Sequence, residues 1–170
     1  MNEIPKDLHF EGDKLIRGIE QLSKAVKSTL GPSGQTVLIE SPHHTHGITV
    51  TKDGVTVAKA VDLLDPVENL AVRIMKEAAD RTASEAGDGT TTSIVLAEAL
   101  VRCGIKGLAG DTNKTEVLRD LVSLTKGVVE ELGLRSRRLT KKHLKSVATI
   151  SANNDKAIGK LIADVYAEVG

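Results

Sequence analysis

Apolar residues recur every three or four positions over much of this chain, as on the buried face of a helix. The spacing predicts a helix over residues 12–28, which ends where "TLGPSG" introduces glycine and proline. It predicts a second long helix over residues 65–87 and a third over residues 90–110. A fourth is expected to start at residue 113. The chain is therefore expected to be mainly α-helical.

The same periodicity predicts which side chains are buried. In the helix that starts with Asp65 as its cap, the expected buried face consists of Val67, Leu70, Ala71, Ile74, Met75 and Ala78. In the helix that starts with Asn113 as its cap, the residues expected to point inward are Val117, Leu121, Val128 and Leu132. Cys103 is interpreted as a small core residue rather than as a reactive thiol.

Two β-branched segments predict a hairpin. "TVLIE" at residues 36–40 and "GITVT" at residues 47–51 flank a short polar turn, and the loop "KDG" then leads into a short helix. The polar and basic stretch "GLRSRRLTKK" at residues 133–142 is the best candidate for a domain boundary. Two shorter amphipathic segments follow it, at residues 143–151 and 155–169.

Composition narrows the class of protein. Hydrophobic residues make up 40% of the 170 residues, with one Tyr, one Phe and no Trp, so aliphatic side chains must form the core. Lys plus Arg equals Asp plus Glu at 23 each, which removes the broad attraction that non-specific nucleic-acid binders use. A single cysteine excludes an intrachain disulfide. With no signal peptide and no membrane-length apolar run, we expect a soluble, cytoplasmic protein with no membrane partner.

Three loops have residues suited to phosphate. They are "TLGP" at 29–32, "TKDG" at 51–54 and "GDGTTT" at 87–92. Each has a glycine that allows the backbone to approach a ligand, and each lies at the predicted end of an element. The last one opens a helix, whose unpaired N–H groups attract phosphate. Taken singly, the first two are more often plain turns, so the hypothesis of a nucleotide site depends on their convergence.

Three side chains in these loops could help to bind a nucleotide and its metal ion. Lys52 supplies a cation for phosphate, and Asp88 supplies a hard oxygen ligand for Mg²⁺. Asp53 is a second carboxylate that could orient a water molecule. The Walker pattern, in which lysine follows the second glycine and precedes Ser or Thr, is absent from the sequence.

At this point a family resemblance is clear. The segments that carry it are "STLGPSGQTVLIE", "ITVTKDGVTVAKAVDL", "PVENLAVRIMKEAADRTASEAGDGTTTSIVLAEAL" and "VATISANND". They resemble the N-terminal part of GroEL-type group I chaperonins, in the same order and at nearly the same spacing. "AGDGTTT" occurs in both chaperonin groups, whereas "TLGPSG" and "TKDG" are typical of group I. The resemblance covers almost all of this chain, which spans well under half of a family member.

The resemblance implies a fold and a function. It implies a helical equatorial ATPase domain with a small β-hairpin over residues 1–134 and, over residues 135–170, a crossover and the start of the intermediate hinge domain. The apical domain and the C-terminal equatorial half would be absent from this chain. It further implies an ATP-dependent, protein-folding homo-oligomeric ring, seven-fold by the family pattern. Unfolded client proteins and a co-chaperonin lid would be its partners, and ATP, Mg²⁺ and K⁺ its ligands.

The resemblance also implies the site residues. Those expected at the nucleotide are Thr29, Leu30, Gly31, Pro32, Lys52, Asp88, Gly89, Thr90, Thr91, Thr92, Ile150 and Ser151. The first four would form a wall of the pocket, Asp88 would bind Mg²⁺, and the glycine and threonines after it would cradle phosphate. Backbone around Thr29 and Lys52 would hold K⁺. Asp53 would lie near the γ-phosphate as a catalytic residue, with the general base expected from the missing C-terminal part. Ile150 and Ser151 would close over the nucleotide.

Some residues depart from the family pattern. Ser33 and Gln35 stand where Lys and Arg are usual, which reduces positive charge near the first loop. The turn "SPHHTHG" carries His43, His44 and His46. Because no carboxylate or thiolate accompanies these histidines, a solvated loop is favoured over a zinc site.

Two other interpretations stay open. The chain, holding half a pocket, could be a portion of a longer chaperonin, or a truncated form that modulates a full-length one without hydrolysing ATP; mass spectrometry of the native polypeptide separates these. A nucleic-acid partner rests on Arg135, Arg137, Arg138, Lys141, Lys142 and Lys145. Without interleaved aromatic residues, this run is better explained as a solvated crossover, and salt-dependent binding to DNA or RNA tests it.

Overall fold

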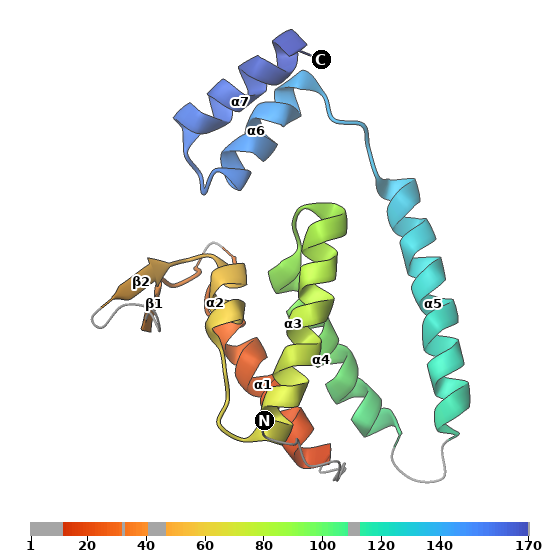
Figure 1. Ribbon diagram of the computed structural model, residues 1–170. Helices are drawn as coiled ribbons and strands as arrows, with labels where there is room; N and C mark the ends of the chain where they lie inside the picture. Colours follow the sequence, from red (N-terminus) through yellow and green to blue (C-terminus); the bar gives the residue numbers. More distant parts are fainter. Residues whose placement is uncertain (1–11, 32, 41–46, 109–112, 170) are drawn as a thin grey trace, which may run out of the picture. The chain divides into compact units, whose positions relative to one another are not determined.

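The computed structural model describes residues 12–31, 33–40, 47–108 and 113–169 of the chain, with seven helices and a two-stranded sheet (Figure 1). This confirms the expected mainly α-helical class with a small hairpin. Contacts divide the chain into two compact units, Met1–Asp111 and Thr112–Gly170. Each unit is described by itself.

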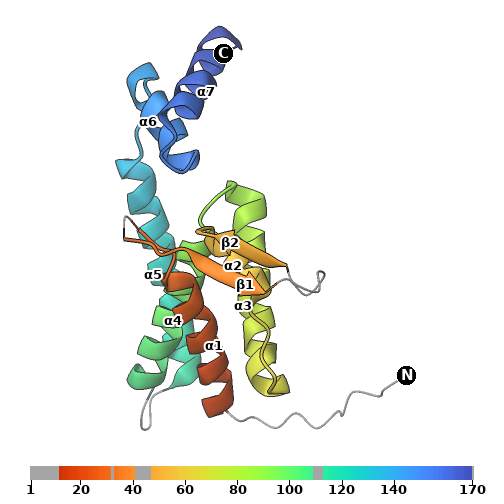
Figure 2. The same cartoon turned by 90° about the vertical axis from the view of Figure 1, so that its left-hand side faces the viewer.

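The first unit is built on a long N-terminal helix. α1 (Gly12–Lys27) packs against α2 (Gly54–Ala60), α3 (Pro66–Ala86) and α4 (Thr90–Gly107), and α3 also packs against α4. Figures 1 and 2 show α1 and α4 side by side. The core between these helices consists of Leu22, Val26, Val57, Ala58, Val72, Met75, Ala79 and Ile94. Aliphatic side chains thus form the core, as composition requires.

The hairpin joins the end of the first loop to the start of α2. β1 (Val37–Glu40) pairs antiparallel with β2 (Ile48–Thr51), with Leu38 opposite Val50. Val37 and Ile39 pack against the core, and their neighbours point away from it, as alternation along a strand requires. Leu38 is 68% exposed and Val50 is 63% exposed. The hairpin therefore presents an apolar pair to solvent.

Capping fixes the ends of α3 as predicted. The Asp65 carboxylate accepts hydrogen bonds from the backbone N–H groups of Val67, at 2.8 Å, and Glu68, at 3.2 Å. Gly87 ends the helix in the left-handed region, at φ 74°. Asp65 and Gly87 are the residues that the sequence predicts at the start and the end of this helix.

The predicted buried face of α3 is only partly right. Ala71 and Met75 are buried, and Val67 is half-buried, but Leu70, Ile74 and Ala78 are exposed. The buried stripe instead includes Val72 and Ala79, so it is rotated around the helix. The reason is that α1 and α4 both pack on this side of α3, and the sequence of α3 alone does not reveal where its neighbours lie.

The crossing of α1 and α3 is close. A Cβ on Gly18 would lie 2.2 Å from the backbone oxygen of Glu68, so a larger residue would force the helices apart. At the same crossing, Arg17 Nε of α1 lies 2.9 Å from Glu68 Oε1, and Gln21 Nε2 lies 3.1 Å from Glu68 Oε2. Glu68 thus ties the middle of α1 to the start of α3.

The second unit contains three helices. α6 (Lys141–Ser151) packs against α7 (Lys156–Val169), and Gly159 is buried against Thr149. α5 (Lys114–Arg135) starts at the predicted cap, Asn113, and forms no extended contact with another described element. Its residues predicted to point inward are therefore not buried: Val117 is half-buried, and Leu121, Val128 and Leu132 are exposed.

One further prediction is contradicted by the structure. Cys103 is exposed, so its interpretation as a core residue is wrong. The reason is that the buried stripe of α4 runs through Thr90, Ile94 and Glu98, and Cys103 lies outside it. The histidine-containing turn, like Pro32, falls outside the described residues. The boundary between equatorial and hinge domains near residue 134 stays a prediction. Within the described part, no helix is long and apolar enough to cross a membrane.

Candidate functional site

The three loops singled out from the sequence meet at Gly54, the first residue of α2. A Cβ built on Gly54 would lie 2.1 Å from Thr91 Oγ1 and 3.1 Å from Thr29 Oγ1. Thr29 belongs to the first loop, Gly54 to the second and Thr91 to the third. The structure therefore brings together, at contact distance, segments that are far apart in the sequence.

The first loop folds tightly after α1. The Thr29 hydroxyl donates a hydrogen bond to the backbone oxygen of Val26, at 2.8 Å, which fixes its direction. Gly31 lies in the left-handed region at φ 78°, which favours glycine. A Cβ on Gly34 would lie 2.3 Å from the Thr29 backbone oxygen, so the chain turns back closely around Thr29. Leu30 is about half exposed, at 47%.

Asp53 caps α2 in the second loop. Its Oδ2 accepts hydrogen bonds from the Thr56 backbone N–H, at 2.9 Å, and the Thr56 hydroxyl, at 2.6 Å. Burial acts to raise the pKa of the Asp53 carboxyl, but the hydrogen bonds from Thr56 and the Val55 N–H outweigh it, so the pKa lies below its ordinary value. Asp53 is thus ionised at neutral pH and held in one orientation.

The third loop joins α3 to α4 through two glycines. Gly87 and Gly89 are both left-handed, at φ 74° and 91°, with Asp88 exposed between them. Gly89 is the N-cap of α4 and provides no side-chain hydrogen bond to it. Its own N–H donates to Asp88 Oδ1 at 2.6 Å. The first turn of α4 therefore lacks the side-chain cap that α2, α3 and α5 each have.

An uncapped helix start is suited to an anion. The first N–H groups of a helix have no partner within the helix, and the macrodipole adds partial positive charge there. Thr90 is buried and Thr91 is half-buried, whereas Thr92 is exposed. Lys52 is exposed and forms no ion pair within the part of the chain that the structure describes. Backbone donors, an unpaired lysine and the Asp88 carboxylate can together accommodate a phosphate and its metal ion.

Two predicted site residues belong to the second unit. Ile150 and Ser151 belong to α6, in the second unit, and their relation to the three loops stays a prediction. Among the described residues, no group of three or more His, Cys, Asp or Glu side chains is arranged to hold a metal ion by itself. A metal ion at Asp88 would therefore need ligands from the nucleotide or from water.

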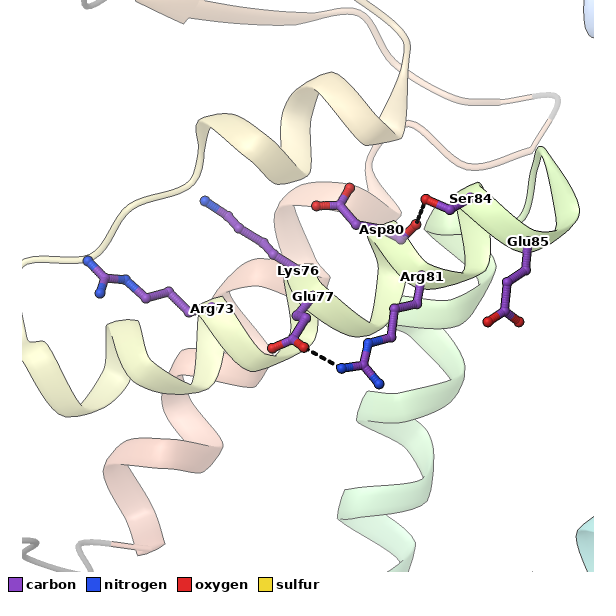
Figure 3. Close-up of a pocket in the computed structure, with 7 residues that line it drawn as sticks. All are labelled: Arg73, Lys76, Glu77, Asp80, Arg81, Ser84 and Glu85. Atoms are coloured by element: carbon purple, nitrogen blue, oxygen red, sulfur yellow. Dashed lines mark hydrogen bonds and ion pairs between the residues drawn. The ribbon is translucent and has the colours of Figure 1, made fainter.

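A hollow lies along one side of α3, between Arg73 and Glu85 (Figure 3). Some of its charged groups have partners within the lining or beside it. Arg81 Nη2 lies 2.6 Å from Glu77 Oε1, and Lys76 Nζ donates to the Lys59 backbone oxygen at 3.0 Å. Since one helix supplies all of its lining, this surface does not form a candidate site.

Sequence reasoning missed one buried carboxylate near the loops. The Glu98 side chain is only 5% exposed, and it contacts α1 through Lys27 and Ser23. The hydrogen bond from the Lys27 ammonium lowers the pKa of the Glu98 carboxyl against the effect of burial. The sequence could have predicted its burial, because Glu98 lies at helical spacing from Ile94 and Thr90 on the buried stripe.

The sequence model of the TCP-1/cpn60 chaperonin family matches residues 22–169, most of the chain. The chain belongs to this family. The match spans the three loops, α1 from Leu22 onward and all the later elements. The fold and the converging loops therefore belong to a chaperonin.

Solved chaperonin structures agree with this assignment. The chaperonin gp146 from the bacteriophage EL 2 (Pseudomonas aeruginosa), solved in the presence of ATP-BeFx in crystal form II, has a TM-score of 0.80 and 32% identity, over 92% of this chain and 28% of that one. Crystal form I of the same protein gives the same values. A group III chaperonin in the open state has a TM-score of 0.77 and 24% identity, over 92% of this chain and 31% of that one, and shows the fold alone. This chaperonin chain thus spans under a third of the length of these relatives.

The close contact at Gly54 leads to a stability prediction. Alanine normally stabilises a helix relative to glycine, by about 0.5–1 kcal/mol. We expect Gly54→Ala instead to lower the free energy of unfolding by about 1–3 kcal/mol, because the new methyl group must displace Thr91. Thermal unfolding without nucleotide measures this.

Gly104→Ala is the matched control. Gly104 lies within α4, and a Cβ there would meet nothing within 4 Å, so this change should stabilise the protein. Equal stabilisation by both alanines would show that the three loops are not in contact at Gly54.

Proposed function

We propose that this chain is the nucleotide-binding portion of an ATP-driven, protein-folding chaperonin of group I. The observation that carries the proposal is the meeting of the three loops at Gly54, beside the uncapped start of α4. Family membership supports it, as does the solution of the related gp146 in the presence of ATP-BeFx. The assignment to group I rests on the amino-acid sequences of the first two loops, "TLGPSG" and "TKDG".

In this proposal the third loop binds the phosphates and the metal ion. Backbone N–H groups of the three threonines donate to phosphate oxygens, for which the helix dipole is favourable, and Gly89 allows the backbone to approach them. The Asp88 carboxylate ligates Mg²⁺, which in turn contacts the phosphates. Lys52 adds a cation beside them, and its exposed ammonium is available for that role.

The other two loops complete this side of the pocket. Residues 29–32 form a wall, and the backbone near Thr29 and Lys52 coordinates K⁺. Asp53 orients water near the γ-phosphate. Its lowered pKa makes it a weak proton acceptor, so we assign the general base to another carboxylate. We expect Ile150 and Ser151 to close over the nucleotide. We expect the protein to work in the cytoplasm.

We further propose that the protein assembles into a homo-oligomeric, seven-fold ring that binds unfolded clients and a co-chaperonin lid. The hairpin supports assembly. Its two strands pair only with each other among the described residues, and both outer edges can accept a further strand. Leu38 and Val50, opposite each other in register, present an apolar surface next to those edges.

The ring proposal predicts an effect of these two residues on assembly. Leu38→Ser combined with Val50→Ser should shift the protein from rings toward smaller species, because it removes exposed apolar surface without touching the core. Sedimentation at micromolar concentration with ATP measures this. Thr49→Ser, at an exposed neighbouring position, is the control and should leave rings intact. A protein that is monomeric before any substitution would contradict the ring.

Asp88→Asn tests the nucleotide site itself. As a simple structural residue, Asp88 could be replaced by Asn at little cost, because Asn accepts the same backbone hydrogen bond. As a ligand of Mg²⁺ it must supply a negative charge, which the amide lacks. We expect ATP turnover of the full-length protein to fall by roughly 100-fold or more, the scale of losing a few kcal/mol of transition-state stabilisation.

The melting temperature without nucleotide is the control for this substitution, and it should stay nearly unchanged. Measuring turnover and melting on one preparation separates a metal ligand from a structural residue. Normal turnover in the Asn variant would remove Asp88 from the metal site and reject the proposed function.

A further inference from the structure

We propose that Glu98 is a positioning residue for the nucleotide site, because its carboxylate locks α1 and α4 in the one register that brings the first and third loops together. This inference rests on the proposed function. Glu98 lies well inside α4, about two turns beyond the threonines of the third loop, so it acts through the helices rather than on the nucleotide.

The carboxylate gathers donors from both helices. Its Oε2 accepts hydrogen bonds from the Lys27 ammonium and, at 3.3 Å, from the Ser23 hydroxyl, both on α1. Its Oε1 accepts from Arg102 Nη1 of α4, at 3.3 Å. Arg102 also lies 3.9 Å from Glu20 of α1. Two groups of α1, Lys27 and Ser23, thus bond directly to one buried carboxylate of α4, and Glu20 joins them through Arg102.

These contacts follow a fixed register. Thr29 approaches Thr91 across Gly54, Lys27 and Ser23 reach Glu98, and Glu20 faces Arg102. Position increases along α4 as it decreases along α1, so the helices are antiparallel, and their loop-bearing ends lie together. Lys27 is the last residue of α1 and stands two positions before Thr29. A shift of α1 along α4 would therefore move the first loop directly.

Stability alone does not explain a buried charge at position 98. The buried stripe of α4 has Thr90, Ile94 and Glu98, and an apolar residue at the last position would pack against the core without the cost of desolvating a carboxylate. Apolar contacts are non-directional and tolerate sliding, whereas hydrogen bonds to a single carboxylate do not. The lowered pKa of the Glu98 carboxyl keeps it charged at neutral pH, where this contact is needed.

Glu98→Gln distinguishes positioning from simple electrostatics by the sign of its effect. The substitution removes a negative charge near a site for anionic phosphate, so electrostatics alone would tighten binding. Positioning predicts the opposite, since the ion pair with Lys27 is lost. We expect the Kd of Mg·ATP for the full-length protein, measured by titration calorimetry, to rise by about 10-fold.

Glu68→Gln is the matched control. Glu68 also ties α1 to a neighbouring helix through a cation, Arg17, and its side chain is 15% exposed, but its contacts, Arg17 and Gln21, lie in the middle of α1, whereas Lys27 lies at the end next to the first loop. The substitution removes the same charge as Glu98→Gln, and the Kd of Mg·ATP for this variant should change by less than about 2-fold. Both variants are compared at a temperature where their unfolding curves show each fully folded.

The outcomes separate the inference from the function beneath it. If the unaltered protein binds Mg·ATP and Glu98→Gln leaves the Kd unchanged or lowers it, the positioning role is wrong while the nucleotide site stands. If both glutamine variants weaken binding equally, the effect belongs to general loosening of α1, and the inference is again wrong. An unaltered protein that does not bind Mg·ATP rejects the proposed function, and this inference with it.

A second variant covers the case in which Glu98→Gln does not fold. The double variant Lys27→Met, Glu98→Leu replaces the ion pair by two apolar side chains and leaves the net charge unchanged. Such an exchange of a buried ion pair is often neutral for stability. Positioning predicts a folded protein with the same rise of about 10-fold in Kd. Binding as tight as that of the unaltered protein would overturn the inference.

Discussion

The contact at Gly54 is the constraint on which the first unit depends. With Thr91 Oγ1 2.1 Å and Thr29 Oγ1 3.1 Å from where a Cβ would stand, the start of α2 is wedged between the end of α1 and the start of α4. Three neighbouring features stabilise this arrangement. The Thr29 hydroxyl is turned back onto Val26, the Asp53 carboxylate starts α2 at this point, and two left-handed glycines turn the chain from α3 into α4.

Two carboxylates align α1 with the helices around this meeting point. Glu68 fixes the middle of α1 to α3, where Gly18 allows close approach, and Glu98 fixes the C-terminal part to α4. Between them lies the aliphatic core around Leu22 and Val26. Packing supplies most of the stability of such a bundle, while the two carboxylates define how the helices are aligned. The proposed function uses that alignment, since the phosphate site is shared by segments of different helices.

Local signals allowed much of this to be predicted from the sequence. Caps such as Asp65 and Asn113, the left-handed glycine at 87 and the β-branched segments of the hairpin act within a few residues, so the element ends were found nearly in place. The buried face of α3, the exposed Cys103 and the exposed side chains of α5 depend on which neighbours are present, and spacing alone does not give that. The loops were identified by their residue types. Their meeting at Gly54 and the role of Glu98 in α4 are tertiary features that needed the structure.

The most direct test of this account is a structure of the full-length protein with Mg²⁺ and a non-hydrolysable ATP analogue. The account predicts phosphate oxygens at about 2.7–3.2 Å from the backbone nitrogens at the start of α4, with Mg²⁺ bound to Asp88 and the nucleotide in contact with residues 29–31. A nucleotide bound away from the start of α4, or a metal ion that Asp88 does not ligate, would contradict it.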